Sequence, residues 1–242
     1  MITTLRAKSL KEANEIEVPE DYIKINVLSW HKKDTEYYDL CPYVLKTDGN
    51  EDDESKPGIL FENYWQSMKM YPYVESMVVK PNVKSNIIWW EYETDGKEIH
   101  FEDNNATNNY FKWRDSIWDC KNPIRYPNGY KNKSKCLFSR VLVNGTERRY
   151  NYIKARKQIY VKQYMRLIED IDSYKKLLKL LNKGKNLCIV EVDLPAPGKK
   201  RYYGLYANQT LTVEKLKDLI DDPSESFGHG LALALSLLID MD

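Results

Sequence analysis

Two runs of apolar residues constrain the fold of this chain most strongly. Residues 231–239 are apolar on almost every side of a helix, so this helix must be buried. Residues 186–193 have the composition of a strand that is covered on both faces. With 242 residues, the chain is long enough to bury such elements in one large domain, or in one domain with a sizeable insertion.

The composition is that of an ordinary globular protein, with 42% hydrophobic and 30% charged residues. A net charge of +1 gives no general attraction to nucleic acid or to a membrane surface, so a nucleic-acid partner would need a local patch, and we expect no membrane partner. The sequence also lacks the phosphate-binding, dinucleotide-binding, zinc-protease and serine-hydrolase motifs. The common motif-bearing enzyme classes are therefore not supported.

The cysteines and histidines predict neither a metal site nor a cofactor. They are few, widely spread and without zinc-ligand spacing: Cys41, Cys120, Cys136, Cys188, His31, His100 and His229. The N-terminal residues lack the apolar region of a signal peptide, and no apolar run has the length of a membrane span. We therefore expect a cytoplasmic protein with reduced thiols.

Local patterns predict one domain over residues 1–242 with two special segments. Residues 1–20 are polar, and Pro19 ends any helix there, which predicts a weakly ordered arm. Residues 72–152 are predicted to form a β-rich insertion. The other predicted elements are a strand at 22–28, an extended segment at 37–45, a loop at 47–58, helices at 61–71, 153–168, 172–182 and 212–220, and the two runs named above.

Two dipeptides in the insertion predict β-hairpins. Asp95-Gly96 lies between the alternating segments 86–92 and 97–101, and Asn144-Gly145 lies between 136–143 and 147–152. Asp, Asn and Gly tolerate the positive φ angles that tight hairpin turns require.

The helix at 61–71 carries an unusual polar stripe. At helical spacing Glu62, Gln66 and Lys69 share one edge, while aromatic residues and Met68 cover the opposite side. A carboxylate, an amide and an amine on one edge are the groups of a possible active site. The alternative is that Glu62 and Lys69 simply face solvent, as the polar side of an amphipathic helix usually does.

Residues 110–135 interleave aromatic side chains with Lys and Arg, which permits two interpretations. The rings could stack on bases while the cations bind phosphates, so nucleic acid is a possible partner. Alternatively, the rings form a small core with Lys and Arg extending around it.

The start of the C-terminal helix also has two interpretations. Gly228 and Gly230 would let backbone amides approach a ligand, and a helix N-terminus favours an anion. Alternatively, both are turn glycines and His229 is a half-buried histidine with satisfied hydrogen bonds. Glu191 and Asp193, at the end of the predicted buried strand, are further candidates because buried carboxylates are rare.

Several segments together resemble the NADAR superfamily, the NAD- and ADP-ribose-associated N-glycosidases. Residues 62–69, Glu-Asn-Tyr-Trp-Gln-Ser-Met-Lys, resemble the family's E-x-Y-[FW]-Q-x-x-K helix, with Asn63 in place of the usual His. Leu40-Cys41-Pro42-Tyr43 is similar to its L-S-N-F-type segment, and Phe227-Gly228-His229-Gly230 to its W-G-x-G segment. The helices at 156–164 and 177–184, followed by the strand at 187–193, resemble the family's helix pair and strand. Residues 72–152 have no counterpart.

The resemblance implies an α+β fold, with a mainly helical NADAR-like core, a short sheet and an inserted β-rich hairpin subdomain. It implies an N-glycosidase for an ADP-ribosylated base or a related ribosyl-nucleotide, without a cofactor; the alternative is a non-catalytic protein that binds nucleotide or single-stranded nucleic acid. Glu62 would stabilise the oxocarbenium charge, and the Lys69 amine would form a Schiff base with the ribose. The implied substrate-binding residues are Tyr43, Trp65, Gln66, Trp90, Glu191, Asp193, Gly228, His229 and Gly230.

Overall fold

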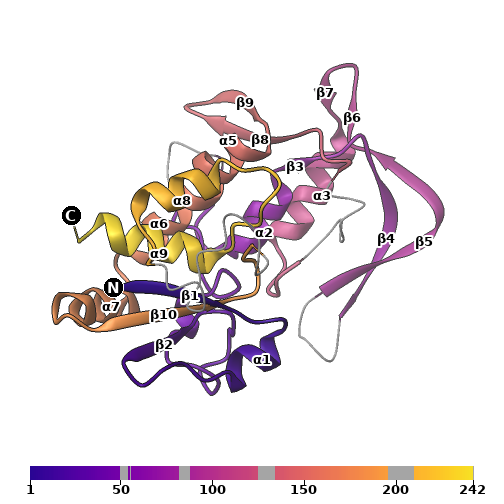
Figure 1. The fold of residues 1–242 in the computed structure, drawn as a ribbon. Helices are drawn as coiled ribbons and strands as arrows, with labels where there is room; N and C mark the ends of the chain where they lie inside the picture. Colours follow the sequence, from indigo (N-terminus) through magenta and orange to yellow (C-terminus); the bar gives the residue numbers. More distant parts are fainter. Residues whose placement is uncertain (50–53, 55, 82–87, 125–133, 196–209, 242) are drawn as a thin grey trace. The chain divides into compact units, whose positions relative to one another are not determined.

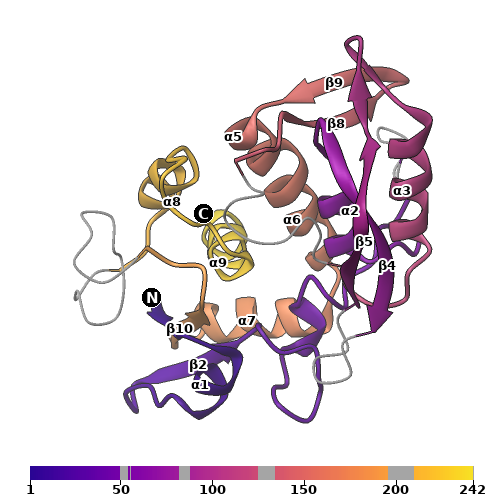
Figure 2. The ribbon, with the colours of Figure 1, turned by 90° about the vertical axis from the view of Figure 1, so that its right-hand side faces the viewer.

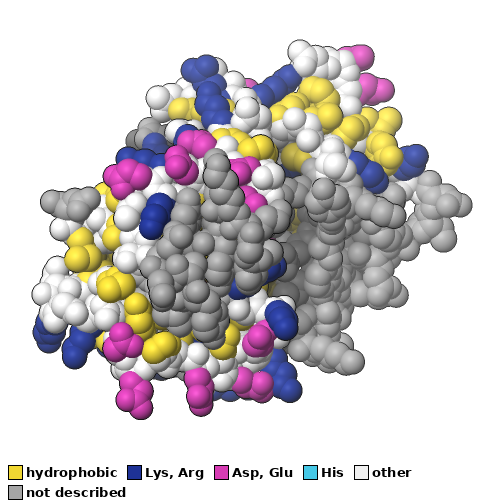
Figure 3. Space-filling model, viewed as in Figure 1, with side chains coloured by type: hydrophobic (Ala, Val, Ile, Leu, Met, Phe, Trp, Pro, Cys, Tyr) yellow, Lys and Arg dark blue, Asp and Glu magenta, His cyan; other side chains and the backbone are white. Residues whose placement is uncertain are grey.

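A computed structural model describes residues 1–49, 54, 56–81, 88–124, 134–195 and 210–241, apart from the side chains of 75–81 and 88–95 (Figure 1). The fold is α+β, as predicted, with four small sheets in the described part of the chain. None of the described helices combines the length and hydrophobicity of a bilayer span. Lys and Arg are interspersed with Asp and Glu on the face shown in Figure 3, in keeping with the near-zero net charge.

The chain forms two compact units. Unit 1 comprises residues 1–45 and 156–242, and unit 2 comprises residues 46–155. The predicted insertion at 72–152 lies within unit 2, together with the helix that carries the polar stripe.

Unit 1 is built on a parallel sheet of order β1-β10-β2. Its middle strand, β10, is buried along nearly its whole length, as its apolar sequence predicts. Helix α9 packs against β10 and is buried over most of its surface (Figures 1 and 2). The elements of this unit are β1 (Ile2–Arg6), α1 (Leu10–Glu15), β2 (Tyr22–Asn26), the 3-10 turn η1 (Tyr38–Leu40), the π-helical η2 (Arg156–Val161), α6 (Lys162–Ile168), α7 (Asp172–Asn182), β10 (Asn186–Glu191), α8 (Val213–Ile220) and α9 (His229–Ile239).

Unit 2 places two helices against each other and adds three small antiparallel sheets. Helices α2 and α3 contact each other (Figure 1). The elements are α2 (Phe61–Ser67), β3 (Lys69–Met70), β4 (Tyr73–Pro81), β5 (Ile88–Ile99), β6 (Phe101–Glu102), β7 (Asn105–Ala106), α3 (Asn108–Trp118), β8 (Phe138–Val143), β9 (Thr146–Tyr150) and α5 (Tyr152–Ala155).

The prediction of a weakly ordered arm at residues 1–20 is wrong. Residues 2–5 are buried in strand β1, which pairs with β10, and helix α1 follows. The Ser9 side chain accepts a hydrogen bond from the amide of Glu12, and the Glu12 carboxylate accepts one from the amide of Lys8. A Ser-x-x-Glu capping signal was therefore present in the sequence, whereas the partner of β1 is distant along the chain.

Of the two predicted hairpins, the structure confirms one. Asn144 and Gly145, with φ angles of 50° and 71°, join β8 to β9. The prediction of a hairpin at Asp95-Gly96 is wrong, because β5 runs through these residues and pairs with β4. Glu75 lies opposite Lys97 and Met77 opposite Tyr92, so the Asp-Gly pair belongs to an irregularity in the ladder.

Three further predictions need correction. Residues 108–118 form helix α3 inside the predicted β-rich region, with Thr107 as its N-cap. The predicted extended segment at 37–45 contains the 3-10 turn η1 instead. Helix α2 ends at Ser67, so Lys69 belongs to strand β3 and not to the helix.

Candidate active site

Glu62, Gln66 and Lys69 form a chain of hydrogen bonds in unit 2. Gln66 Nε2 donates to Glu62 Oε1 at 2.7 Å, and Lys69 Nζ donates to Gln66 Oε1 at 2.6 Å. The helix orients Glu62 and Gln66 one turn apart, and Lys69 reaches back from β3. The amide thus connects the predicted carboxylate with the predicted amine.

The side chains of Glu62, Gln66 and Lys69 are more buried than those on an ordinary solvent-facing helix edge. The Glu62 residue is only 7% exposed, and Gln66 and Lys69 are half-buried. The Lys69 amine also lies 5.0 Å from the ring centroid of the buried Trp65. The alternative interpretation of Glu62 as a solvent-facing carboxylate is therefore wrong.

The rest of α2 is fixed by contacts with α3 and the segment after it. Asn63 Nδ2 lies 3.1–3.2 Å from the carbonyl oxygens of Ile117, Cys120 and Asn122, and Asn63 Oδ1 accepts from the amide of Ile124 at 2.7 Å. The sequence reasoning missed this role, because the partners are far from Asn63 along the chain. The only signal was the departure from the family's histidine at this position.

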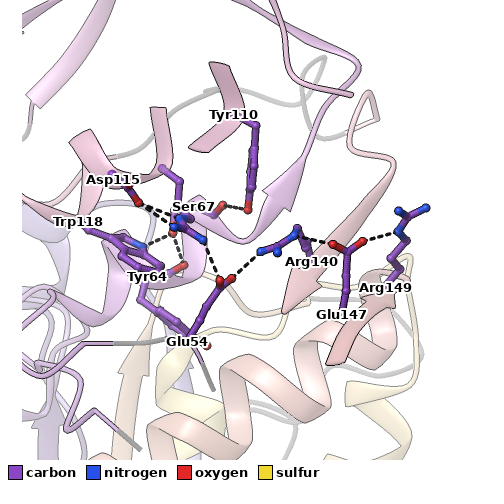
Figure 4. A network of polar contacts seen from close by, with 10 residues as sticks. Glu54, Tyr64, Ser67, Tyr110, Asp115, Trp118, Arg140, Glu147 and Arg149 are labelled. Carbon is purple, nitrogen blue, oxygen red and sulfur yellow. Dashed lines mark hydrogen bonds and ion pairs between the residues drawn. The ribbon is translucent and has the colours of Figure 1, made fainter. Parts of the chain in front are cut away.

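A second contact between these helices involves Ser67. Trp118 Nε1 donates to Ser67 Oγ at 2.7 Å, and the hydroxyl of Tyr110 donates to the Ser67 carbonyl at 3.1 Å (Figure 4). Both partners are buried side chains of α3. Helix α2 is thus held against α3 through Ser67, while Glu62 and Gln66 lie on a neighbouring edge of the helix.

Cys136 lies near the hydrogen-bonded side chains of Glu62, Gln66 and Lys69, and the sequence did not indicate that it belongs to this region. Burial raises the pKa of its thiol, and the charge of Lys69 opposes this rise. Cys120 and Cys188 likewise have a raised pKa because they are buried, that of Cys188 to about 12. None of the four cysteines forms a disulfide, and the raised pKa values keep these three thiols protonated, which disfavours a thiolate nucleophile.

Apart from Trp90, the other predicted site residues lie in unit 1, and Glu191 contacts Asp193, His229 and Gly230. This fully buried carboxylate accepts hydrogen bonds from the amides of Val192 and Asp193 at Oε1, and from the amide of Gly230 at Oε2. Its Oε2 is also 3.6 Å from His229 Nδ1. The N-terminus of α9 therefore already binds an anion, supplied by the protein's own β10.

The backbone amides of Gly228 and Gly230 do not support the predicted phosphate site. The amide of Gly230 donates to Glu191, and the amide of Gly228 donates to the carbonyl of Asp193 at 3.2 Å. His229 Nε2 donates to the carbonyl of Val27 at 2.8 Å. The interpretation of His229 as a histidine with satisfied hydrogen bonds agrees with this geometry.

Three of the predicted residues in unit 1 keep accessible surface: Tyr43, Asp193 and His229. Tyr43 is half-buried, with its ring centroid 5.1 Å from that of Trp30, and Asp193 is exposed. Tyr164 connects two of the segments that resemble the NADAR superfamily: its hydroxyl donates to the carbonyl of Leu40, and its ring packs edge-on against His229. These segments are thus near one another within unit 1.

The last predicted site residue, Trp90, lies in β5 opposite Val79, and its side chain is outside the described part of the structure. The aromatic residues of α3 favour the core interpretation, because Tyr110, Trp113 and Trp118 are buried. Residues 125–133, which supply the rest of the aromatic and basic pattern, are outside the description, so nucleic-acid binding stays a prediction. Within the described residues, no group of His, Cys, Asp or Glu is placed to hold a metal ion.

No family model matches this chain, and no curated protein or solved structure shows significant similarity to it. The resemblance to the NADAR superfamily therefore depends on the residues themselves, chiefly Glu62, Gln66 and Lys69.

Proposed function

We propose that this protein is an N-glycosidase that releases a base from an ADP-ribosylated nucleobase or a related ribosyl-nucleotide. The observation that carries the proposal is the buried Glu62 carboxylate, joined through Gln66 to the Lys69 amine. The order of these residues also resembles the E-x-Y-[FW]-Q-x-x-K helix of the NADAR superfamily. Both the geometry and the resemblance support a role in catalysis for the same three side chains, those of Glu62, Gln66 and Lys69.

The proposed chemistry uses each of these groups. As the N-glycosidic bond breaks, positive charge develops at the anomeric carbon, and the Glu62 carboxylate stabilises it. The Lys69 ammonium first loses a proton to water, and the resulting free amine attacks that carbon while the base leaves with the bonding electron pair and takes up a proton. Opening of the ribose ring gives a protonated Schiff base on Lys69, which water hydrolyses to free ribosyl product and enzyme. Gln66 holds both groups in place.

The proposed catalytic groups all lie in unit 2, and a substrate-binding role for Tyr43 and Asp193 of unit 1 stays a prediction of the resemblance. Glu191, Gly228 and Gly230 are assigned a structural role, because their polar groups are already paired.

The test is to incubate the purified protein with ADP-ribosylated guanosine, NAD-derived nucleotides and ribosylaminopyrimidines, and to measure the released base by chromatography. Glu62→Gln and Lys69→Met should each reduce the rate by about 100-fold or more. Glu102→Gln and Lys112→Met change exposed residues of the same unit and should retain the activity. Thermal unfolding of every variant controls for loss of structure.

Borohydride trapping tests the covalent step separately. Reduction during turnover should attach the ribosyl fragment to Lys69, as mass spectrometry of the digested protein would show. Turnover without a trapped adduct, and unaffected by Lys69→Met, would remove Lys69 from the mechanism. If the wild-type protein releases no base from any of these substrates, the proposed function is wrong.

A further inference from the structure

Two arginines of unit 2 converge on a single carboxylate. Arg114 Nη1 donates to Glu54 Oε2 at 2.8 Å, and Arg140 Nη1 donates to Glu54 Oε1 at 2.7 Å. Figure 4 labels Glu54 and Arg140. Glu54 precedes α2, Arg114 lies on α3 and Arg140 on β8. Each carboxylate oxygen therefore has its own guanidinium donor.

Each arginine is also held by a second carboxylate. Asp115 Oδ1 accepts from Arg114 Nε and Nη2 at 3.0 and 2.9 Å. Glu147 Oε2 accepts from Arg140 Nε at 2.9 Å, while its other oxygen accepts from Arg149 (Figure 4). Burial opposes ionisation of Glu147, but the hydrogen bonds from Arg149 and Arg140 bring its pKa below its ordinary value. The anionic form of Glu147 is thus well suited to orient Arg140.

Aromatic rings lie close to both guanidinium groups. The Arg114 guanidinium carbon is 4.3 Å from the Trp118 ring centroid and 5.1 Å from that of Phe111. The Arg140 guanidinium carbon is 5.1 Å from the Phe111 centroid and 5.9 Å from that of Tyr110. The second carboxylates and the aromatic rings therefore help to hold the two Nη1 groups in position, in addition to Glu54.

Charge and burial make the position of the Glu54 carboxylate a specific place for an anion. The side chains of Arg114 and Arg140 are 12% and 6% exposed, and an unpaired guanidinium at such depth is costly. Three arginines, Arg114, Arg140 and Arg149, balance the carboxylates of Glu54, Asp115 and Glu147, so removing Glu54 leaves one excess positive charge. The 12% exposure of Glu54 shows that solvent reaches this position.

We propose that Arg114 and Arg140 form a binding site for a phosphoryl group, which the Glu54 carboxylate occupies in this structure and yields to a phosphate dianion. Arginine pairs bind phosphate through the same charge-assisted hydrogen bonds that they make with a carboxylate, and a dianion has more charge and more acceptor oxygens than Glu54. The site uses none of the residues proposed for catalysis.

The test compares the effect of inorganic phosphate on thermal unfolding of the wild type, Glu54→Ala and Glu54→Gln, with chloride at matched ionic strength as the salt control. Removing the competing carboxylate should let phosphate raise the Tm of Glu54→Ala by about 3 °C at ten times its Kd. Glu102→Ala removes one exposed carboxylate of the same unit and should respond as the wild type does. Addition of Arg114→Gln to Glu54→Ala should abolish the response.

The wild type should show the same response with an apparent Kd about 10-fold weaker, because only the fraction of molecules in which Glu54 has left the arginines binds phosphate. Two results would overturn the proposal. One is a phosphate response of Glu54→Ala and Glu54→Gln no greater than that of Glu102→Ala. The other is binding by these variants but none by the wild type at phosphate about 100-fold above the Kd of Glu54→Ala, since Glu54 would then be a permanent structural partner of the arginines.

Discussion

A methyl group on the α-carbon of Gly228 would stand 2.5 Å from the carboxylate carbon of Glu191. The carboxylate cannot easily move away, because the amides of Val192, Asp193 and Gly230 hold it. Gly228 is therefore required by close approach, and its φ of −75° is open to any residue.

Gly228→Ala should lower the free energy of unfolding by about 2–4 kcal/mol, since the added methyl forces the buried carboxylate out of its hydrogen bonds. Urea denaturation measures this loss. Gly184→Ala is the control: Gly184 has a φ of 72° but nothing within 4 Å of the added methyl, so only backbone strain of about 1 kcal/mol is expected. Equal losses in the two variants would contradict the close-approach argument.

The elements that the sequence predicted well are those with local signals. Helix α7 begins and ends as predicted, and Gly184 after it has the expected positive φ. The Asn144-Gly145 turn also has a local signal, because these two residues themselves adopt the positive φ angles of the turn. Thr212 caps α8 as its sequence indicates, accepting a hydrogen bond from the amide of Lys215.

The elements that were missed depend on distant partners or on competing signals. Strand β1 is stabilised by parallel pairing with β10, more than 180 residues later. The polar composition of the surrounding residues gives no indication of this pairing. The long pairing of β4 with β5 overrides the turn preference of Asp95-Gly96. Helix α3 did have a helical signal in the spacing of Tyr110, Trp113 and Ile117, all buried, which the basic residues between them obscured.

In the candidate site, too, the contacts with local signals were predicted and those between distant residues were not. Helical periodicity was sufficient to place Glu62 and Gln66 on one edge, and Lys69 still reaches Gln66 although the helix ends before it. By contrast, Glu54 is 60 residues from Arg114 and 86 from Arg140, so no local pattern indicates that they meet.

Asn63→Ala should destabilise unit 2, because it leaves three backbone carbonyls and the amide of Ile124 without their side-chain partner. Two or three lost hydrogen bonds in a buried position correspond to about 3 kcal/mol. Asn109→Ala, on the exposed side of α3, should change stability by less than about 0.5 kcal/mol. Chemical denaturation followed by Trp fluorescence would compare them, and similar stabilities would show that Asn63 does not hold the segment after α3.

His100 should make the stability of unit 2 depend on pH. Neither ring nitrogen has a hydrogen-bond partner among the described residues, the side chain is fully buried, and the nearest carboxylate oxygen, from Glu98, is 3.8 Å from Nε2. Burial lowers the pKa of His100 to about 4, against about 6.5 in an unfolded chain. Because the unfolded state binds the proton more readily, the stability is complete above pH 6.5 and is lost as the pH falls towards 4.

The expected loss between pH 7 and pH 5 is about 2 kcal/mol in the free energy of unfolding. His100→Phe keeps a ring between Tyr110 and Trp113 but cannot be protonated, so it should remove this part of the pH dependence. His31→Phe removes a histidine of unit 1 and should retain the loss, since His100 is still present. Urea unfolding at both pH values measures the difference. A loss of the same size in His100→Phe and in the wild type would show that His100 does not cause the pH dependence between pH 7 and pH 5.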